Sequence, residues 1–307
     1  MVSRSLGAAA GVMADRLLGE PPAVAHPVAR FGTVMRRVEG QLYRDTRDAG
    51  AAHAAVGLGL AVAAGAALGS PAAAAYVAVA GRALAGAALE VEAALARDDL
   101  ATARELLPAL VGRDPSCLDE PEIARAAVES VAENTVDAVV APALWAAAAG
   151  APGVFAYRAI NTLDAMVGYR SSHYDRFGWA SARLDDAAGL IPARVTAGLV
   201  VAVRPRTAAR VARAVRHDAP AHPSPNAGVA EAAFAAALGV SLGGTNRYGE
   251  RVEHRPPLGG GRAPRATDIR AAVRLSRDVT GALVALLVAP SVVRWLRHRL
   301  GTNGRTR

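Results

Sequence analysis

Long uncharged stretches dominate the hydrophobic pattern of this chain. Residues 49–81 contain no Asp, Glu or Arg. A single helix of that length would reach about 50 Å, well beyond the roughly 30 Å hydrocarbon core of a bilayer. Because Gly-Ser-Pro at 69–71 interrupts the run near its middle, the pattern predicts a helical hairpin with arms at about 49–68 and 72–89.

Four further stretches are candidates for membrane segments. Residues 138–157 carry no charge, although their prolines and glycines predict a broken or re-entrant segment. Residues 187–203 are apolar apart from Arg194, and the stretches 232–246 and 279–293 are marginal in length. The pattern therefore predicts four to six spans and an all-α, polytopic integral membrane protein. A soluble, alanine-rich helical bundle is the alternative.

Composition narrows the chemistry. The 307 residues include 75 alanines and 35 arginines but no lysine, which excludes a P-loop lysine, a Schiff-base lysine and a lysine general base. The single cysteine, Cys117, excludes a disulfide framework and a cysteine-based zinc site. Alanine and leucine favour helices, and alternating β-branched runs are scarce.

The net charge of +8 indicates an orientation in the membrane. Clusters of five arginines lie in 30–47, in 204–216 and in the basic tail 294–307, and the positive-inside rule places them in the cytoplasm. We expect a multi-pass protein of the cell membrane. No nucleic-acid module or interleaved aromatic pattern accompanies the charge, so nucleic acid is not an expected partner.

Between the apolar runs, an acidic helix is predicted over 121–137. At 100° per residue Glu122, Glu129, Glu133 and Asp137 fall within an arc of about 80°, with Arg125 beside them. Carboxylates four residues apart with few basic neighbours repel one another, so we expect a cation to bridge them. The helix leads into the uncharged run from residue 138, and such a stripe suits Mg²⁺.

Three other polar stretches stand out. Asn161 and Asp164 share one helix face, and the pair Asp185-Asp186 opens the next apolar run. Ser224 or Asn226 is predicted to cap an alanine-rich helix at about 227–240, whose amino terminus is a candidate anion site. The glycines that follow, at 243 and 244, predict a turn that approaches a ligand closely. Near the start of the chain, Asp15 and His26 flank a helix stop with two prolines.

Taken together and in order, these stretches resemble the CobD/CbiB family, the adenosylcobinamide-phosphate synthases of cobalamin biosynthesis. The resemblance covers roughly residues 11–290. It rests on the segments D-R-L-L-G-E-P-P…H-P-V, E-S-V-A-E-N-T-V-D-A-V-V-A-P, Y-R-A-I-N-T-L-D-A-M-V-G-Y, F-G-W-A-S-A-R-L-D-D…I-P-A-R, S-P-N-A-G and L-G-G. One departure is Ala188-Gly189, where a polar, Asn-like residue is expected after the Asp pair.

The resemblance implies an amide-forming ligase that joins cobyric acid, adenosylated or not, to aminopropanol or its phosphate. It implies a single membrane domain over 1–307, with a hairpin at about 49–89 and a cytoplasm-facing active site built from 114–186 and 217–260. The corrinoid, the small amine and the lipid bilayer are its expected partners. A homo-oligomer and a complex with pathway enzymes are both compatible with it.

ATP as cosubstrate and Mg²⁺ are the expected cofactors, because a carboxylate must be activated before it acylates an amine. The candidate catalytic residues are Glu129, Glu133, Asp137, Asp164, Asp185 and Asp186. Four of these, Glu133, Asp137, Asp185 and Asp186, are candidate Mg²⁺ ligands. The candidate substrate-binding residues are Asp15, His26, Asn134, Asn161, Arg183, Arg194, Ser224 and Asn226.

Two other functions remain open. A Mg²⁺-dependent membrane transferase of the prenyl type also places Asn and Asp at helix ends, although the repeated Asp-x-x-Asp or Asp-x-x-x-Asp pairing of such sites is missing here. A non-catalytic membrane sensor or scaffold that shares the fold is the third hypothesis, and it has no need of the acidic stripe.

Overall fold

The computed structural model describes residues 2–20, 27–169, 171–248 and 251–303, so the candidate residue His26 lies outside the described ranges. Five helices in the described chain are long and apolar enough to cross a membrane. They are Arg47–Leu68, Pro71–Leu95, Glu120–Val167, Trp179–Val203 and Ala266–Arg294. The protein is therefore an all-α, multi-pass membrane protein, as predicted, with one small two-stranded sheet added.

The chain forms two compact units, each described by itself below. Unit 1 contains Met1–Val79, Pro142–Asp185 and Gly281–Arg307, and unit 2 contains Ala80–Ala141 and Asp186–Thr280. Helices α8 (Ala141–Val167), α9 (Trp179–Val203) and α12 (Ala266–Asn303) continue from one unit into the other. The expectation of a single membrane domain stays a prediction.

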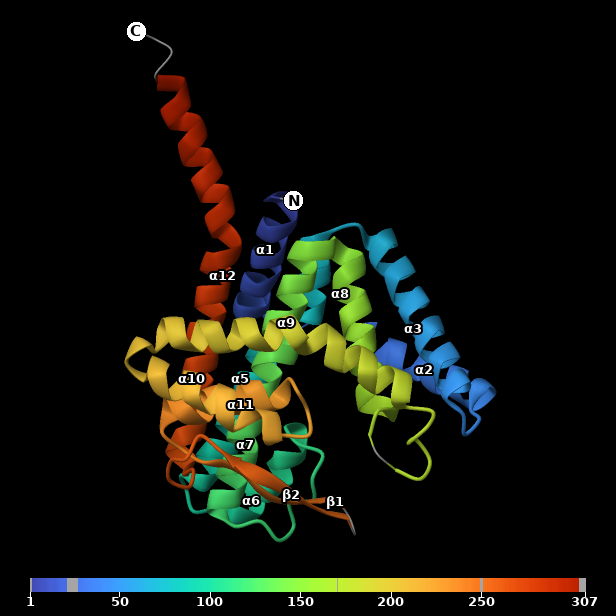
Figure 1. The fold of residues 1–307 in the computed structure, drawn as a ribbon, viewed down its shortest axis with the longest axis vertical. Helices are drawn as coiled ribbons and strands as arrows, with labels where there is room; N and C mark the ends of the chain where they lie inside the picture. The colour runs from blue at the N-terminus through green and yellow to red at the C-terminus, as the bar shows by residue number, and fades with distance from the viewer. Residues whose placement is uncertain (1, 21–26, 170, 249–250, 304–307) are drawn as a thin grey trace. The chain divides into compact units, whose positions relative to one another are not determined.

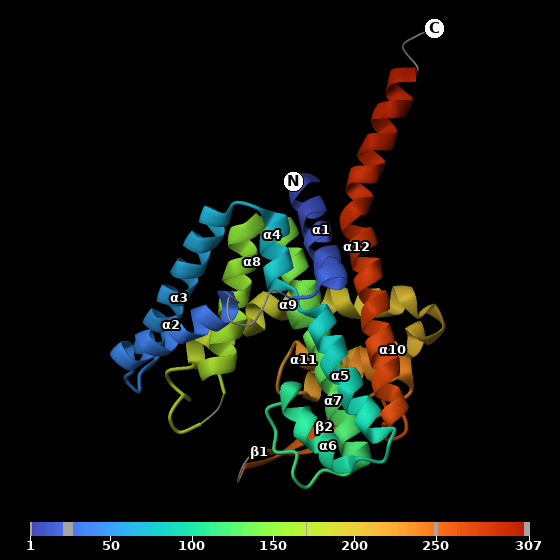
Figure 2. The same ribbon diagram turned by 180° about the vertical axis from the view of Figure 1, so that it is seen from behind.

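Unit 1 begins with four helices, and the predicted hairpin lies among them (Figures 1 and 2). These are α1 (Val2–Leu18), α2 (Pro27–Leu42), α3 (Arg47–Leu68) and α4 (Pro71–Ala78). Gly69 ends α3 in the left-handed region at φ 66°, and the hydroxyl of Ser70 caps α4 by accepting from the Ala73 amide at 3.3 Å. The break at 69–71 is confirmed. The second arm is itself divided, because a new helix, α5 (Gly81–Leu95), begins at Gly81.

Glycines on one face of α3 allow α8 to approach closely. A Cβ built on Gly65 would lie 2.6 Å from the carbonyl oxygen of Ala151, and one on Gly57 would lie 2.9 Å from Leu163 Cδ1. Small residues at such contacts are the usual means by which helices associate in lipid, where the hydrophobic effect gives no drive for association.

The uncharged run 138–157 is broken, as predicted. Gly150 adopts φ 70° and ψ −155°, a conformation open mainly to glycine, and Pro152 follows it. The chain turns here between two helical arms, 141–149 and 151–167 (Figure 1). Residues 136–140 just before α8 form a π-helical turn, η3 (Val136–Val140), that the sequence pattern did not predict.

Unit 2 packs around two helices that are buried along most of their length, α7 (Glu120–Thr135) and α11 (Ala227–Leu238). Around them lie α6 (Leu100–Leu106), η2 (Leu107–Ala109), η4 (Pro205–Thr207), α10 (Ala208–His217), η5 (Ala219–Ala221) and the strands β1 (Leu242–Tyr248) and β2 (Arg251–Leu258). The many alanines on α7 and α11 let neighbouring backbones come close, and every residue from Ile123 to Ala132 is buried.

One predicted membrane segment is wrong. The stretch 232–246 does not form a span, because α11 ends at Leu238, where Gly239 takes the left-handed conformation at φ 73°. The chain then enters β1, which pairs antiparallel with β2 through Leu242↔Leu258 and Gly244↔Arg255, with a bulge between Leu242 and Gly244. The stretch 279–293, by contrast, lies within the candidate span of α12.

The glycine face of α3 makes a testable prediction. Gly65→Ala should lower stability by about 1–3 kcal/mol, since its methyl group would overlap the backbone of α8. Gly59→Ala on the same helix should be neutral or stabilising by up to about 1 kcal/mol, because nothing lies within 4 Å of its Cβ position. Thermal unfolding of both variants in detergent measures the difference, and equal melting temperatures would contradict the packing.

Candidate functional site

The acidic helix α7 is fixed at its amino terminus by a capping box. Asp119 accepts from the Glu122 amide at 2.9 Å, and the Glu122 carboxylate accepts from the Asp119 amide at 3.0 Å. The side chains of Asp119 and Glu122 thus cap the start of α7 reciprocally, which is the usual role of a capping box. The helix therefore presents its later carboxylates, from Glu129 onward, at defined positions.

Glu129 is buried, with 2% of its surface exposed, and both of its carboxylate oxygens are engaged. Arg113 donates to Oε2, and the Gly243 amide of β1 donates to Oε1 at 2.9 Å. Arg125 lies 3.9 Å from the same Oε1. The expectation that this stripe has few basic neighbours is therefore wrong for Glu129, because the chain itself supplies the cation.

The two arginines extend this network to the β-hairpin. Arg113 also donates to the side-chain oxygen of Asn246. Arg125 donates to the carbonyl oxygens of Gly243 and of Thr245, the latter at 2.9 Å. The glycines that were predicted to approach a ligand instead bring the β1 backbone up to a carboxylate and an arginine of the protein. Arg113 and Asn246 were missed by the sequence analysis, since neither lies at a helical spacing from Glu129.

Further along the stripe the environment changes. Glu133 is exposed, and Asp137 and Asn134 are half-buried. The Asn134 amide donates to the carbonyl oxygen of Ser130 at 3.0 Å. Asp137 lies inside the π-helical turn η3, and such turns recur at functional sites. Glu133 and Asp137 are thus more accessible to solvent than Glu129, which is buried.

A carboxylic acid that the sequence analysis did not select lies in the same interior. Glu231 of α11 is 1% exposed, and neither of its oxygens has a hydrogen-bond partner among the described residues. Its Oε1 is 3.8 Å from Nε2 of His222. Burial raises the pKa of Glu231 well above its usual value, and the nearby charges of Glu129 and Glu133 raise it further. One signal was available: Glu231 is the sole charge in its helix.

His222 does not supply a compensating charge at neutral pH. Burial lowers the pKa of His222, and the positive charge of Arg255 lowers it further, against the opposing effect of the Ser224 carbonyl. Nδ1 of the ring lies 3.1 Å from both the carbonyl oxygen and the amide nitrogen of Ser224. The raised pKa of Glu231 and the lowered pKa of His222 both favour the neutral side chain, which avoids a buried, unpaired charge.

Of the two residues predicted to cap α11, Ser224 is the one whose side chain binds amides at the start of the helix. Its hydroxyl oxygen accepts from the amides of Asn226 and Ala227 at 3.3 and 3.2 Å. Asn226, the other alternative, is the N-cap residue of α11, but its side chain makes no capping hydrogen bond. Its amide instead donates to the carbonyl oxygen of Asp186 at 2.8 Å and accepts from Arg194 at 3.1 Å. Asn226 therefore links α11 to α9.

This link explains the departure at Ala188-Gly189. A Cβ on Gly189 would lie 2.6 Å from Nδ2 of Asn226, so the glycine leaves the space that the amide occupies. A polar group is thus present beside the Asp pair, although it comes from α11.

In unit 1 the structure brings together Asn161 of α8 and Asp185 of α9. The Asn161 amide donates to the Asp185 carboxylate at 3.4 Å, and Arg158 donates to the Asn161 oxygen at the same distance. Asp164 lies against the last turn of α8, where a Cβ on Gly168 would overlap its carboxylate. These contacts join Asn161 and Asp185. Asp164 lies one helical turn further along α8 than Asn161.

The remaining predicted residues are dispersed. Asp15 is buried within α1, whereas Arg183 and Arg194 of α9 are both exposed. No group of three or more His, Cys, Asp or Glu side chains in the described ranges lies close enough to hold a metal ion. Mg²⁺ often uses one or two protein carboxylates and completes its shell with water and substrate phosphates, so the four candidate ligands stay a prediction.

A first prediction concerns Asn226. Gly189→Ala should displace the Asn226 amide and break two hydrogen bonds, each worth about 0.5–1.5 kcal/mol, and Asn226→Ala should cost a similar sum. Gly198→Ala, on the same helix with nothing within 4 Å of its Cβ position, is the control and should not destabilise. Melting temperatures in detergent test this, and a stable Gly189→Ala variant would count against the bridge.

A second prediction concerns pH. Because the folded pKa of Glu231 is raised, the folded protein holds a proton that the unfolded chain releases above about pH 4.3. The free energy of unfolding therefore falls as pH rises from there toward the folded pKa. Glu231→Gln removes this loss, so its melting temperature relative to wild type should rise as the pH increases above about 4.3. Glu90→Gln, at an exposed position, should show no such trend.

Comparison with known proteins identifies the family. The CobD/Cbib protein family matches residues 8–276. "Cobalamin biosynthesis protein CobD" of Mycobacterium tuberculosis (strain ATCC 25618 / H37Rv) is 48% identical, over 93% of this chain and 95% of the relative. Proteins of the same name from Geobacter metallireducens and Rhodobacter capsulatus are 41% and 40% identical, each over 92% of this chain and 95% of the relative. No solved structure matches the chain. By this match over most of its length, the chain belongs to the CobD/CbiB family.

Proposed function

We propose that this protein acts in cobalamin biosynthesis as an amide-forming ligase. It joins cobyric acid, with or without the adenosyl group, to aminopropanol or aminopropanol phosphate and gives cobinamide or its phosphate. The observation that carries the proposal is the match to relatives named for cobalamin biosynthesis over 93% of the chain. The polar side chains at the ends of apolar helices support it, since intramembrane and boundary carboxylates are costly unless they serve a function.

The reaction requires activation of a carboxylate. At neutral pH a carboxylate does not acylate an amine, so ATP transfers a phosphoryl group to it and the amine then displaces phosphate from the acyl phosphate. One proton leaves the amine as the amide bond forms. Phosphoryl transfer depends mainly on positioning and on neutralisation of charge, and in a chain without lysine these tasks fall to arginines, helix amino termini and a metal ion.

The candidate residues divide into carboxylates that would bind a metal ion and an arginine that would bind an anionic group of the substrate. Glu133 and Asp137 would hold Mg²⁺ together with phosphate oxygens, and Asp185 and Asp186 are the alternative ligands. When bound, Mg²⁺ would neutralise the charge that develops on the phosphates. Exposed Arg194, held on one side by Asn226, is suited to a phosphate or carboxylate because its guanidinium forms paired hydrogen bonds.

Glu129 has a different role in this proposal. Its oxygens are occupied by Arg113 and by the β1 backbone, so it positions α7 and does not touch the substrate. The active site faces the cytoplasm, where the arginine clusters at 30–47 and 204–216 are expected by the positive-inside rule and where ATP is available.

An in vitro reaction tests the proposal. Purified protein in detergent is incubated with cobyric acid, aminopropanol or its phosphate, and ATP with Mg²⁺, and the corrinoid is followed by mass spectrometry. We expect an amide product that requires all components. Formation of a lipid diphosphate from prenyl substrates would favour the prenyl transferase. An unchanged corrinoid with folded, membrane-reconstituted protein would favour a sensor or scaffold.

Two neighbouring carboxylates should respond in opposite ways. Glu133→Gln should lower turnover by more than about 100-fold with little change in melting temperature, because an exposed substitution usually shifts stability by less than about 0.5 kcal/mol. Glu129→Gln should destabilise the protein by about 3–5 kcal/mol, since it leaves the buried Arg113 without its counter-charge. Measuring turnover per folded molecule and melting temperature for both variants separates the roles. Wild-type turnover in Glu133→Gln would move the site to Asp164 and the Asp185-Asp186 pair.

A further inference from the structure

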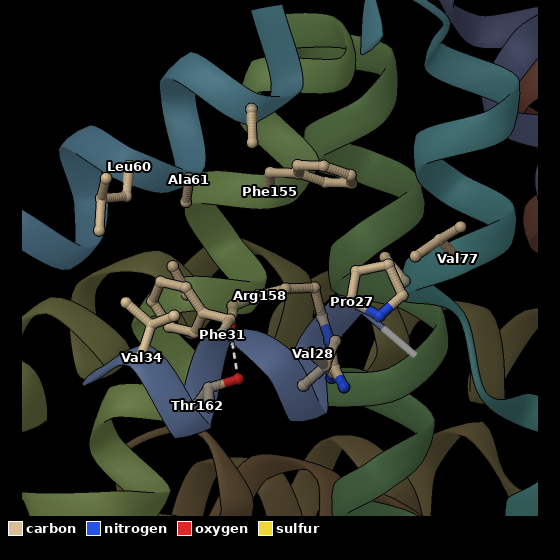
Figure 3. A pocket seen from close by; sticks show the side chains of 13 residues that line it. Pro27, Val28, Phe31, Val34, Leu60, Ala61, Val77, Phe155, Arg158 and Thr162 are labelled. Atoms are coloured by element: carbon tan, nitrogen blue, oxygen red, sulfur yellow. Dashed lines mark hydrogen bonds between the residues drawn. The ribbon is translucent and has the colours of Figure 1, made fainter. Parts of the chain in front are cut away.

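Unit 1 contains a cavity that the proposed reaction does not use. Its volume is about 280 Å³, and its walls come from α2, α3, α4 and the second arm of α8. Figure 3 shows the side chains that line it. All are apolar except Arg158 and Thr162. The hydroxyl of Thr162 is occupied, because it donates to the carbonyl oxygen of Arg158 at 2.6 Å.

The cavity has a polar end and an apolar end. Along α8, Thr162, Arg158 and Phe155 follow one another at helical spacing, and Figure 3 shows Phe155 at the end opposite Thr162. Ala61 of α3 lies on the side of Phe155, and Val28 of α2 lies beside Arg158 (Figure 3). A ligand that matches this cavity is therefore an amphiphile whose apolar part extends toward Phe155.

Arg158 determines the charge of that ligand. Its Nη1 makes a long hydrogen bond of 3.4 Å to Asn161, whereas its Nε is buried and has no hydrogen-bond partner in the described part of the chain. A buried donor without a partner costs about 1–3 kcal/mol, so a bound acceptor would relieve this cost. Arginine binds phosphate oxygens in forked geometry, which favours an anionic group at the polar end.

Size and surroundings narrow the ligand further. A volume of about 280 Å³ lies at the lower limit of small-molecule sites, roughly 300 Å³, so the cavity admits one hydrocarbon chain and excludes a corrinoid ring. Three of the walls belong to candidate membrane spans, Arg47–Leu68, Pro71–Leu95 and Glu120–Val167. The apolar molecules that surround these spans in a membrane are the lipids of the bilayer.

We infer that this cavity binds one acyl chain of an anionic phospholipid, with the lipid phosphate at the Arg158 guanidinium. The inference does not rest on the proposed ligase activity, because its test measures lipid retention, although Arg158 also donates to Asn161, a candidate substrate-binding residue. In this inference Arg158 recognises the lipid headgroup, and the small side chain of Ala61 leaves space for the acyl chain.

Native mass spectrometry of the full-length protein tests this. The protein is released from detergent micelles that contain phosphatidylglycerol or phosphatidylcholine, and retained lipid is counted. We expect one tightly retained phosphatidylglycerol and at least tenfold weaker retention of phosphatidylcholine. Arg158→Gln should abolish that preference, and Ala61→Phe should fill the cavity and abolish retention of both lipids.

Matched controls keep the result interpretable. Arg44→Gln removes an exposed arginine outside the cavity, and Ala63→Phe adds the same ring to an exposed position of α3, so both should retain lipid as wild type does. Equal retention in Ala61→Phe and Ala63→Phe would overturn the inference, as would equal lipid preference in Arg158→Gln and Arg44→Gln. Retention of free fatty acid in place of phospholipid would also overturn it.

A labelling experiment on the wild-type protein does not depend on any variant folding. Phosphatidylglycerol with a diazirine in its acyl chain is photolysed in reconstituted membranes, and labelled peptides are sequenced. We expect labels on the segments 28–34 and 155–162, which line the cavity. Labels confined to exposed faces, such as the segment of α12 around Leu286, would show bulk lipid contact and contradict a bound chain.

Discussion

A buried carboxylate imposes the main constraint on unit 2. Glu129 lies in the interior on a helix whose neighbours are mostly alanine, and an isolated charge there would cost several kcal/mol. The protein meets this cost with an arginine from the preceding loop and an amide from β1. Together with Arg125, which donates to the carbonyl oxygens of Gly243 and Thr245, these contacts fix where the β-hairpin lies against α7. Removal of that one charge would therefore affect the loop, the helix and the strand together.

Much of the membrane architecture could be predicted from the sequence, because it depends on local signals. The Gly-Ser-Pro break after Leu68 and the glycine that interrupts the run 138–157 both act through backbone geometry, and both occur where they were expected. The stretch 232–246 failed because hydropathy does not separate a short buried helix from a span. Its helix ends at a left-handed glycine, and the residues that follow pair as a strand whose partner begins beyond residue 250.

The candidate site was harder to predict, because its contacts join residues far apart in sequence. Helical spacing placed Glu129, Glu133 and Asp137 on one face, but it could not show that Arg113 and the Gly243 amide occupy the first of them. For the same reason Asn226 looked like a cap, since its bond partners on α9 lie 32 and 40 residues away. The π-helical turn that contains Asp137 also has no signature in the spacing of the residues.

Three glutamates of unit 2 show how the environment divides one side-chain type into separate roles. Glu129 has cationic partners and is held as a structural anion. Glu231, equally buried, faces the charge of Glu129 without a hydrogen-bond donor of its own, and burial therefore favours its neutral acid. Glu133 acts on Glu231 through its charge but is itself exposed to water. Because like charges disfavour one another's ionised forms, the charges of Glu129 and Glu133 act on Glu231 in the same direction as its burial, whereas Glu133 itself is solvated at its exposed position.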